Sequence, residues 1–290
     1  MNGIRQRFAR VLTEVERSLD EPLDIRGLAG VAAYSRFHFQ RQFSAFFGVS
    51  ITEYQRLMRM KRAGQQLAFR PSVTVTEIAY DAGYENLESF SRIFKRVFRQ
   101  TPSEFRKAAD WTAWHQTYDP LIELKGQFMP VGNPDFTSLR ISEFPETLVA
   151  VFEHKGPQSD LPASVQKFIA WRKENALPPS KSATFNILYY DPKSTIPEDF
   201  RFDICCAVSG PVTDNEHGVV TKTIPGGPVA VVRHTGSLDF AERTIRALYR
   251  DWLPQSGREL RDFPLFVQRL SFFPDVPEHA AQTDIFLPLQ

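Results

Sequence analysis

The sequence predicts two domains, an all-α tandem helix-turn-helix domain followed by an α+β domain built from a duplicated strand-helix-strand-strand unit. The first observation is a repeat in the N-terminal half, where residues 35–48 and 86–99 share a pattern of phenylalanines. The second is a repeat in the C-terminal half, where LVAVFEHKG (148–156) matches PVAVVRHTG (228–236). The third is charge, because basic residues outnumber acidic ones in residues 1–110 and are outnumbered afterwards.

The N-terminal half reads as a series of helices. Apolar side chains at intervals of three and four predict a helix over residues 4–19. Two short helices, 23–29 and 75–80, each precede a tight turn of small residues. A longer helix follows each turn, and Ser35 and Asn86 are placed to cap their first free backbone amides. Helix, tight turn and helix, present twice, is the arrangement of a tandem helix-turn-helix reader of DNA.

Each of the two longer helices has a core face and an outward face. The predicted core faces consist of Phe39, Phe43 and Phe46 in the first helix and Phe90, Phe94 and Val97 in the second. The N-terminal ends are predicted to enter the DNA major groove, with Arg36, Phe37, Gln40 and Arg41 facing outward in the first helix and Leu87, Glu88, Ser89 and Arg92 in the second. Phe37 could equally belong to the core, and Glu88 could serve only the helix N-terminus.

The rest of this half connects and closes the two motifs. A helix over residues 52–69 is predicted to be a rigid spacer between them. Thr74 and Glu77 form the pattern of a capping box at the start of the second motif. Residues 110–136 combine tryptophans and prolines without a clear period, so we expect a linker with some packing of its own. The predicted domains are therefore residues 1–109 and 137–290.

The stretches LDIRGLAGVAAYSRFHFQRQFSAFFG and TEIAYDAGYENLESFSRIFKRVFRQTPSEFRK resemble the DNA-binding domain of the AraC/XylS family of bacterial transcription regulators. The resemblance covers about residues 5–108. It implies that bases are contacted by Phe37, Gln40 and Arg41 in the first recognition helix and by Glu88, Ser89 and Arg92 in the second. Family members often have a polar residue at the position of Leu87. In this chain Leu87 could instead make an apolar contact with a thymine methyl group.

Two reading helices in one chain predict an asymmetric site on double-stranded DNA. The two helices are expected to enter successive major grooves, roughly 34 Å apart. Phosphate contacts from Arg36, Lys95 and Arg96 are expected to supply most of the affinity and its salt dependence. The basic excess of the N-terminal half suits such a polyanionic partner.

The C-terminal half changes to a rhythm of alternating, β-branched and aromatic residues, which predicts strands. Strands over 139–156 precede an amphipathic helix at 163–172, and two further strands follow. The same order recurs after residue 228, with a second helix at 240–253. Two such units are expected to share one sheet, with both helices on one face and a cleft on the other.

Residues 137–290 resemble the gyrase-inhibitor-like effector-binding domain, a common partner of AraC-type DNA-binding domains. The resemblance implies a cleft for hydrophobic small molecules, often cationic, with aromatic walls and a buried glutamate. Val267 stands where that glutamate is expected, which favours a neutral or weakly polar effector. The expected ligand-binding residues, each of which could instead be ordinary core, are Phe152, Trp171, Phe185, Tyr189, Trp252, Phe266 and Val267.

Several function classes find no support in the sequence. There is no His/Cys cluster with zinc spacing, no phosphate-binding glycine loop and no nucleophile elbow, so we expect no metal, no cofactor, no catalytic residue and no enzyme activity. Without a long apolar run or a signal segment, we expect a cytoplasmic protein with no membrane partner. The adjacent Cys205 and Cys206 suit a reducing compartment.

The sequence therefore predicts a sequence-specific transcription regulator that binds DNA and senses a small effector through its C-terminal domain. Two alternatives stay open. One is a constitutive DNA-binding regulator whose C-terminal domain binds a protein partner, such as RNA polymerase. The other is an effector-type domain with hydrolase activity.

Overall fold

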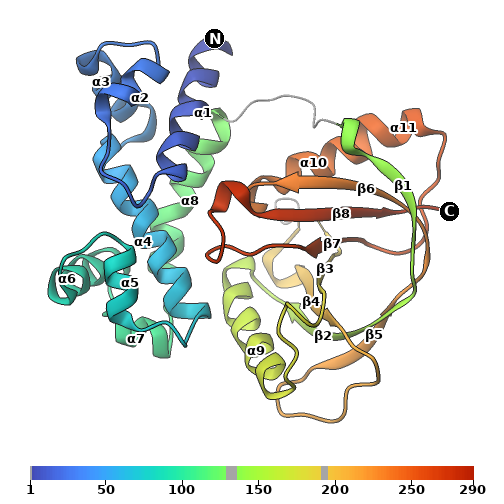
Figure 1. The fold of residues 1–290 in the computed structure, drawn as a ribbon. Helices are drawn as coiled ribbons and strands as arrows, with labels where there is room; N and C mark the ends of the chain where they lie inside the picture. Colours follow the sequence, from blue (N-terminus) through green and yellow to red (C-terminus); the bar gives the residue numbers. More distant parts are fainter. Residues whose placement is uncertain (1, 129–135, 191–194) are drawn as a thin grey trace. The chain divides into compact units, whose positions relative to one another are not determined.

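The protein consists of two compact units in a computed structural model that describes residues 2–128, 136–190 and 195–290. The helical unit comprises Met1–Val131 with Phe273–His279, and the sheet unit comprises Gly132–Phe272 with Ala280–Gln290 (Figure 1). The predicted order, an all-α domain followed by an α+β domain, is confirmed.

Eight helices of the described residues form the helical unit. They are α1 (Asn2–Arg17), α2 (Ile25–Val31), α3 (Arg36–Phe47), α4 (Ile51–Phe69), α5 (Val75–Asp81), α6 (Leu87–Phe98), α7 (Pro102–Lys107) and α8 (Trp111–Phe128). The pairs α2–α3 and α5–α6 are the two helix-turn-helix motifs, and they lie at opposite ends of α4 (Figure 1). The predicted spacer is therefore a continuous 19-residue helix.

The interval 110–136 was expected to be a linker, but its described part contains the 18-residue helix α8. The Trp114 ring stacks on Phe98 of α6, with ring centroids 5.4 Å apart. The Phe128 ring lies 4.8 Å from Phe47 of α3. Because α8 packs against both motifs, it belongs to the core of the helical unit.

The sheet unit contains one antiparallel sheet of eight strands. The strands are β1 (Arg140–Phe144), β2 (Thr147–Lys155), β3 (Thr184–Leu188), β4 (Arg201–Ala207), β5 (Val220–Ile224), β6 (Gly227–Thr235), β7 (Leu265–Arg269) and β8 (Gln282–Pro288), in the order β1-β6-β8-β7-β3-β4-β2-β5. Each repeat thus begins with one strand more than the predicted strand-helix-strand-strand unit, β1 in the first repeat and β5 in the second. The leading strands are exchanged, since β1 pairs with β6 and β5 pairs with β2.

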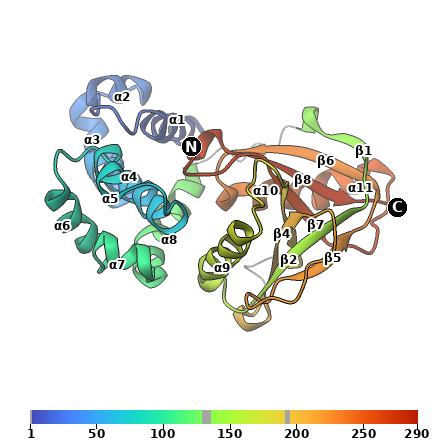
Figure 2. The same cartoon turned by 60° about the horizontal axis from the view of Figure 1, so that its bottom comes forward.

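The helices of the sheet unit cover one face of the sheet. They are α9 (Leu161–Glu174), α10 (Ala241–Ala247), a π-helical turn (Leu248–Trp252) and α11 (Leu253–Ser256). Figure 2 shows α9 lying along β2 and β4. Strand alternation separates the two faces: Cys206 packs with α9, whereas its neighbour Cys205 packs on the opposite face.

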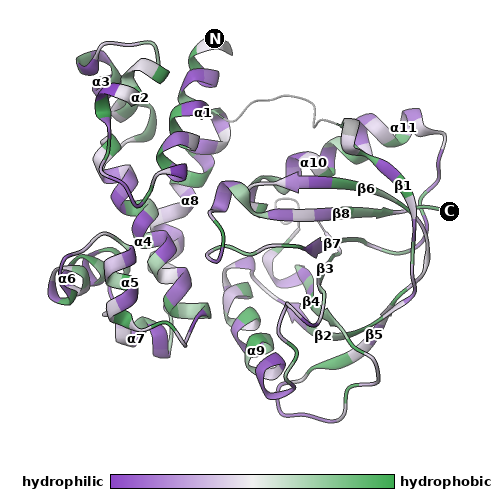
Figure 3. Ribbon diagram, in the orientation of Figure 1, coloured by the Kyte–Doolittle hydropathy of each residue, from purple (hydrophilic) through white to green (hydrophobic). Residues whose placement is uncertain are grey.

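That opposite face is the concave face, because the sheet curls around it. Phe144 of β1 contacts Phe185 of β3 with ring centroids 5.9 Å apart, although three strands separate β1 from β3. The buried apolar residues of the concave face are Phe144, Val149, Val151, Phe185, Ile187, Cys205, Ile224, Val229, Val231, Phe266 and Phe286. In β6 and β8 apolar residues gather at one end and polar residues at the other (Figure 3).

Candidate DNA interface and effector site

The N-terminal end of α3 is held in position while its outward side chains stay free. The Ser35 hydroxyl accepts a hydrogen bond from the backbone N–H of His38 and caps the helix. Phe39 and Phe43 are fully buried and fix the opposite face of the helix in the core. Phe37 is 78% exposed, so the alternative that it belongs to the core is wrong.

The N-terminal end of α6 repeats this arrangement. The Asn86 side chain accepts a hydrogen bond of 2.8 Å from the backbone N–H of Ser89. Phe90 and Phe94 are fully buried, whereas Leu87 is 42% exposed. A large apolar side chain that is exposed at the end of a capped helix is available for an apolar contact with a base.

Equivalent tight turns set the angle between the two helices of each motif. Ala33 in the first turn and Gly83 in the second both have positive φ, at 55° and 80°. In both turns the next residue closes the same backbone hydrogen bond of 3.0 Å, from Tyr34 to Ala29 and from Tyr84 to Ala79. The two motifs therefore share one backbone geometry.

All ten predicted DNA-binding residues lie outside the buried core. Eight are exposed, namely Arg36, Phe37, Arg41, Leu87, Glu88, Arg92, Lys95 and Arg96. Gln40 and Ser89 are partly exposed. Together these side chains give each reading helix arginine and polar groups of the kind that bind base edges and phosphates.

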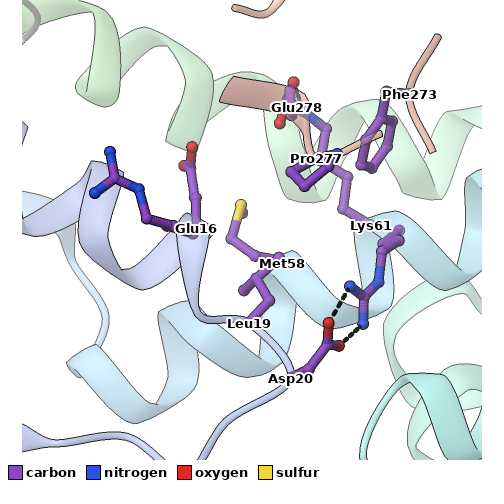
Figure 4. A pocket seen from close by; sticks show the side chains of 10 residues that line it. Glu16, Leu19, Asp20, Met58, Lys61, Phe273, Pro277 and Glu278 are labelled. Atoms are coloured by element: carbon purple, nitrogen blue, oxygen red, sulfur yellow. Dashed lines mark hydrogen bonds and ion pairs between the residues drawn. The ribbon is translucent and has the colours of Figure 1, made fainter. Parts of the chain in front are cut away.

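Arginines of α4 hold the surrounding loops. Arg62 pairs with Asp20 in the turn after α1 (Figure 4) and donates a hydrogen bond of 2.5 Å to the Asp81 carbonyl at the end of α5. The hydrogen bond from Arg62 lowers the pKa of Asp20 below its ordinary value. Arg59 donates to the carbonyls of Leu19 and Glu21. Side chains of α4 thus form hydrogen bonds with the turn that precedes the first motif and with the end of α5 in the second motif.

The predicted ligand-binding residues divide between the two faces of the sheet. Phe185, Tyr189 and Phe266 lie on the concave face, as a cleft requires. Four predictions are corrected: Phe152 and Val267 point from their strands toward the face that the helices cover, and Trp171 and Trp252 belong to those helices. Since Val267 points toward the helices, its neighbour Gln268 is the β7 residue that shares the concave face with Phe266.

Sequence reasoning missed the polar cluster of the concave face. Asp203 of β4 is 1% exposed, and its Oδ2 accepts hydrogen bonds from the Tyr189 hydroxyl at 2.8 Å and from the Lys222 ammonium at 2.7 Å. Lys222 also pairs with Glu153 of β2. The available signal was the aspartate in the otherwise apolar sequence FDICCA (202–207).

Within the described ranges, no group of three or more His, Cys, Asp or Glu side chains could hold a metal ion. None of the helices described for this chain has the length and apolar character to cross a membrane.

Two family models match the chain. A model described as a GyrI-like small molecule binding domain matches residues 137–290, and a helix-turn-helix domain model matches residues 28–108. These matches confirm the two resemblances that the sequence indicated.

Known proteins match the two halves separately. The probable transcriptional regulator YgiV of Escherichia coli strain K12 is 41% identical over 152 residues, which are 52% of this chain and 95% of YgiV. The right origin-binding protein of the same strain is 33% identical over 106 residues, 36% of each chain. The cryo-EM structure of an EcmrR–DNA complex matches 89% of this chain and 85% of that chain at 14% identity, with a TM-score of 0.44.

Proposed function

We propose a function from one premise: this chain belongs to the GyrI-like small molecule binding domain family. It joins that domain to a helix-turn-helix domain, and it is a DNA-binding transcription regulator with an effector-binding domain. In our proposal α3 and α6 read DNA, and the concave face of the sheet unit binds a small molecule that controls this reading.

The DNA-reading proposal rests on one observation: the N-terminal ends of α3 and α6 are exposed in the same way. Each end is capped, each is anchored by buried phenylalanines, and each carries an exposed arginine, Arg41 in α3 and Arg92 in α6. Two readers with the same backbone geometry in one chain suit an asymmetric site that occupies two successive major grooves. Arg36, Lys95 and Arg96 are exposed on the same helices and would serve the phosphates.

We expect Arg41→Ala and Arg92→Ala to act on different halves of the DNA site. Loss of a bidentate arginine–guanine contact should relax base preference at one half-site by about 1–3 kcal/mol. The measurement is in vitro selection of the preferred site with the full chain, followed by affinities for site variants mutated in either half.

Arg10→Ala is the matched control, because Arg10 is an exposed arginine of α1, outside both reading helices. It removes the same charge and should leave base preference unchanged. Unaltered base preference in the Arg41→Ala, Arg92→Ala double variant would show that these arginines are not the readers.

The effector half of the proposal rests on the curled sheet and its aromatic concave face. Phe185 and Phe266 are buried in the wall of this face, Tyr189 is its partly exposed aromatic side chain, and Gln268 is a neutral amide on the face where the family resemblance implies a glutamate. This combination supports a neutral or weakly polar effector. The alternative is a constitutive regulator whose sheet unit binds a protein such as RNA polymerase. Thermal-shift screening of the full chain against small molecules distinguishes the two proposals, because the alternative predicts that no compound stabilises the protein.

A further inference from the structure

One polar cluster lies among the apolar residues of the concave face. Asp203 pairs with Ile187 across β3 and with Glu153 across β2, and Lys222 pairs with Val149, so strand register places their side chains on the concave face. A cluster of charges in the wall of an apolar face is costly to bury unless its groups are paired.

The pairing of Asp203 is incomplete. Its Oδ2 accepts two hydrogen bonds, from Tyr189 and from Lys222, whereas its Oδ1 is buried without any hydrogen-bond partner among the described residues. Tyr189, Lys222 and Glu153 are each partly or fully exposed, so Asp203 lies one side-chain layer below solvent. A buried acceptor that lacks a donor costs free energy, and a ligand that donates one hydrogen bond recovers it.

The charges of the cluster are nevertheless balanced. Lys222 bridges the carboxylates of Asp203 and Glu153, and the Arg201 guanidinium lies 4.4 Å from the centre of the Tyr189 ring. Burial alone would lower the pKa of Lys222, but its hydrogen bonds to Asp203 and Glu153 raise that pKa overall, so the ammonium stays charged. With two carboxylates facing two cations, a further cation gains no net attraction.

The second repeat provides an internal comparison. Asp284 occupies the position equivalent to Asp203, and both of its oxygens accept hydrogen bonds from the Arg233 guanidinium. Asp284 is therefore satisfied within the fold, whereas Asp203 keeps one oxygen open. The fold can therefore satisfy both oxygens of an aspartate at this position, so the unpartnered Oδ1 of Asp203 is not imposed by the sheet.

We propose that Oδ1 of Asp203 is the polar recognition point of the effector site, and that it selects a neutral aromatic molecule carrying a hydroxyl or N–H donor. The aromatic body of the ligand would lie against Tyr189, whose side chain is only partly buried, and its donor would bond Oδ1. This inference rests on the proposed effector role of the concave face and names the chemical class that this role requires.

Two matched naphthalenes and one lipophilic cation separate the possibilities. 2-Naphthol has a hydroxyl donor, 2-methoxynaphthalene has only an acceptor, and tetraphenylphosphonium is a lipophilic cation. Calorimetric titration of the full chain should show 2-naphthol binding about fivefold more tightly than 2-methoxynaphthalene, since one hydrogen bond separates them. Equal affinities, tighter binding of the cation, or no binding of any probe would overturn the inference.

Asp203→Asn tests the named oxygen. Tyr189 and Lys222 are both donors, so the amide oxygen of the variant must take the position of Oδ2 and its NH₂ group the position of Oδ1. The preference should then reverse in favour of 2-methoxynaphthalene. Asp284→Asn is the matched control and should leave the wild-type preference in place, whereas an equal effect of the two variants would overturn the assignment.

Lys222→Met keeps the inference testable if Asp203→Asn fails to fold. It removes the cation that balances Asp203 and Glu153, and we expect tetraphenylphosphonium to gain at least fivefold in affinity. No gain by the cation would count against the charge balance. DNA affinity of the same samples is measured in parallel, because loss of DNA binding contradicts the proposed reading helices, whereas altered probe selectivity alone concerns only the ligand class.

Discussion

The two tight turns have the same backbone conformation but place different residues, Ala33 and Gly83, at the position with positive φ. Ala33 adopts positive φ without being glycine, which costs an L-residue roughly 1 kcal/mol. Gly83 takes the equivalent place in the second motif, where an added Cβ would lie 2.4 Å from an Arg59 guanidinium nitrogen. The same turn is therefore strained in one motif, and in the other an added side chain would displace the Arg59 guanidinium.

We expect opposite stability changes at these two positions. Ala33→Gly should raise the free energy of unfolding by about 0.5–1 kcal/mol, because it relieves the strained φ. Gly83→Ala should lower it by about 1–2 kcal/mol, since it adds both strain and a steric clash with Arg59. Urea unfolding followed by circular dichroism measures both changes, and shifts in the same direction would contradict the equivalence of the turns.

Helical periodicity predicted most of the buried residues of the reading helices. Phe39, Phe43, Phe90 and Phe94 are buried, as expected. Phe46 and Val97 were also expected in the core but are only partly buried, and Phe47 and Phe98 take the buried positions instead. Steps of three and four residues both keep a side chain near the same face, so only the tertiary packing decides which residue is fully buried.

Among the elements, α8 shows the limit of sequence periodicity. Pro120 lies inside this helix, and the tryptophans and prolines of residues 110–136 together show no clear period, so the segment resembled a linker. Its helical state depends on tertiary packing. Gly64 of α4 is essential for that packing, because a Cβ there would lie 2.5 Å from the Trp114 ring. The contact between α8 and α4 joins segments that are far apart in the sequence, so the local pattern of residues 110–136 could not reveal it.

The faces of the sheet show the same limit. Alternation predicts that Phe266 and Val267 point to opposite faces, but it does not say which face the helices cover. The sequence therefore identified the repeat and its strands except β5, but it assigned Phe152 and Val267 to the wrong face of the sheet and took Trp171 and Trp252, which belong to the helices, as cleft residues.

The capping box of α5 predicts an acid-sensitive helix start. The Thr74 hydroxyl and backbone N–H both donate to Glu77, and these hydrogen bonds lower the pKa of Glu77 below its ordinary value of 4.5. A depressed carboxyl pKa stabilises the fold above the unfolded-state pKa, and this stability is lost as pH falls through the folded-state value.

Thr74→Ala should therefore lower the free energy of unfolding by about 1 kcal/mol at pH 7. The loss should be smaller at an acidic pH below the lowered pKa of Glu77, where protonation of its carboxyl weakens the reciprocal bond. Thermal melts at the two pH values measure the difference. An equal loss at both would mean that the carboxylate contributes nothing to the cap.

At the scale of the whole molecule, charge is divided between the two units. The reading helices lie within the basic residues 1–110, whereas the sheet unit carries 16 basic and 18 acidic residues. Neutralising phosphates releases condensed counterions, so DNA affinity should fall steeply as salt increases. The nearly neutral sheet unit should add little electrostatic attraction for DNA, so the salt dependence should come from the helical unit.

Arg36→Ala should reduce the slope of log affinity against log salt by about one, because one phosphate contact is lost. The affinity of the full chain for its selected DNA site, measured from low to physiological salt, tests this expectation. Arg250→Ala provides the control, since Arg250 is an exposed arginine of the sheet unit and should leave the slope unchanged. A slope that is insensitive to Arg36 would remove it from the phosphate-binding set.

The exchange of leading strands between the repeats has a consequence for how this protein can evolve. Because β1 completes the second copy and β5 completes the first, neither copy can be deleted without opening the other. Both copies must therefore persist under selection, although only one needs to change when a new ligand is favoured. The copy that contains Asp284 preserves the scaffold, and the copy that contains Asp203 is free to diversify.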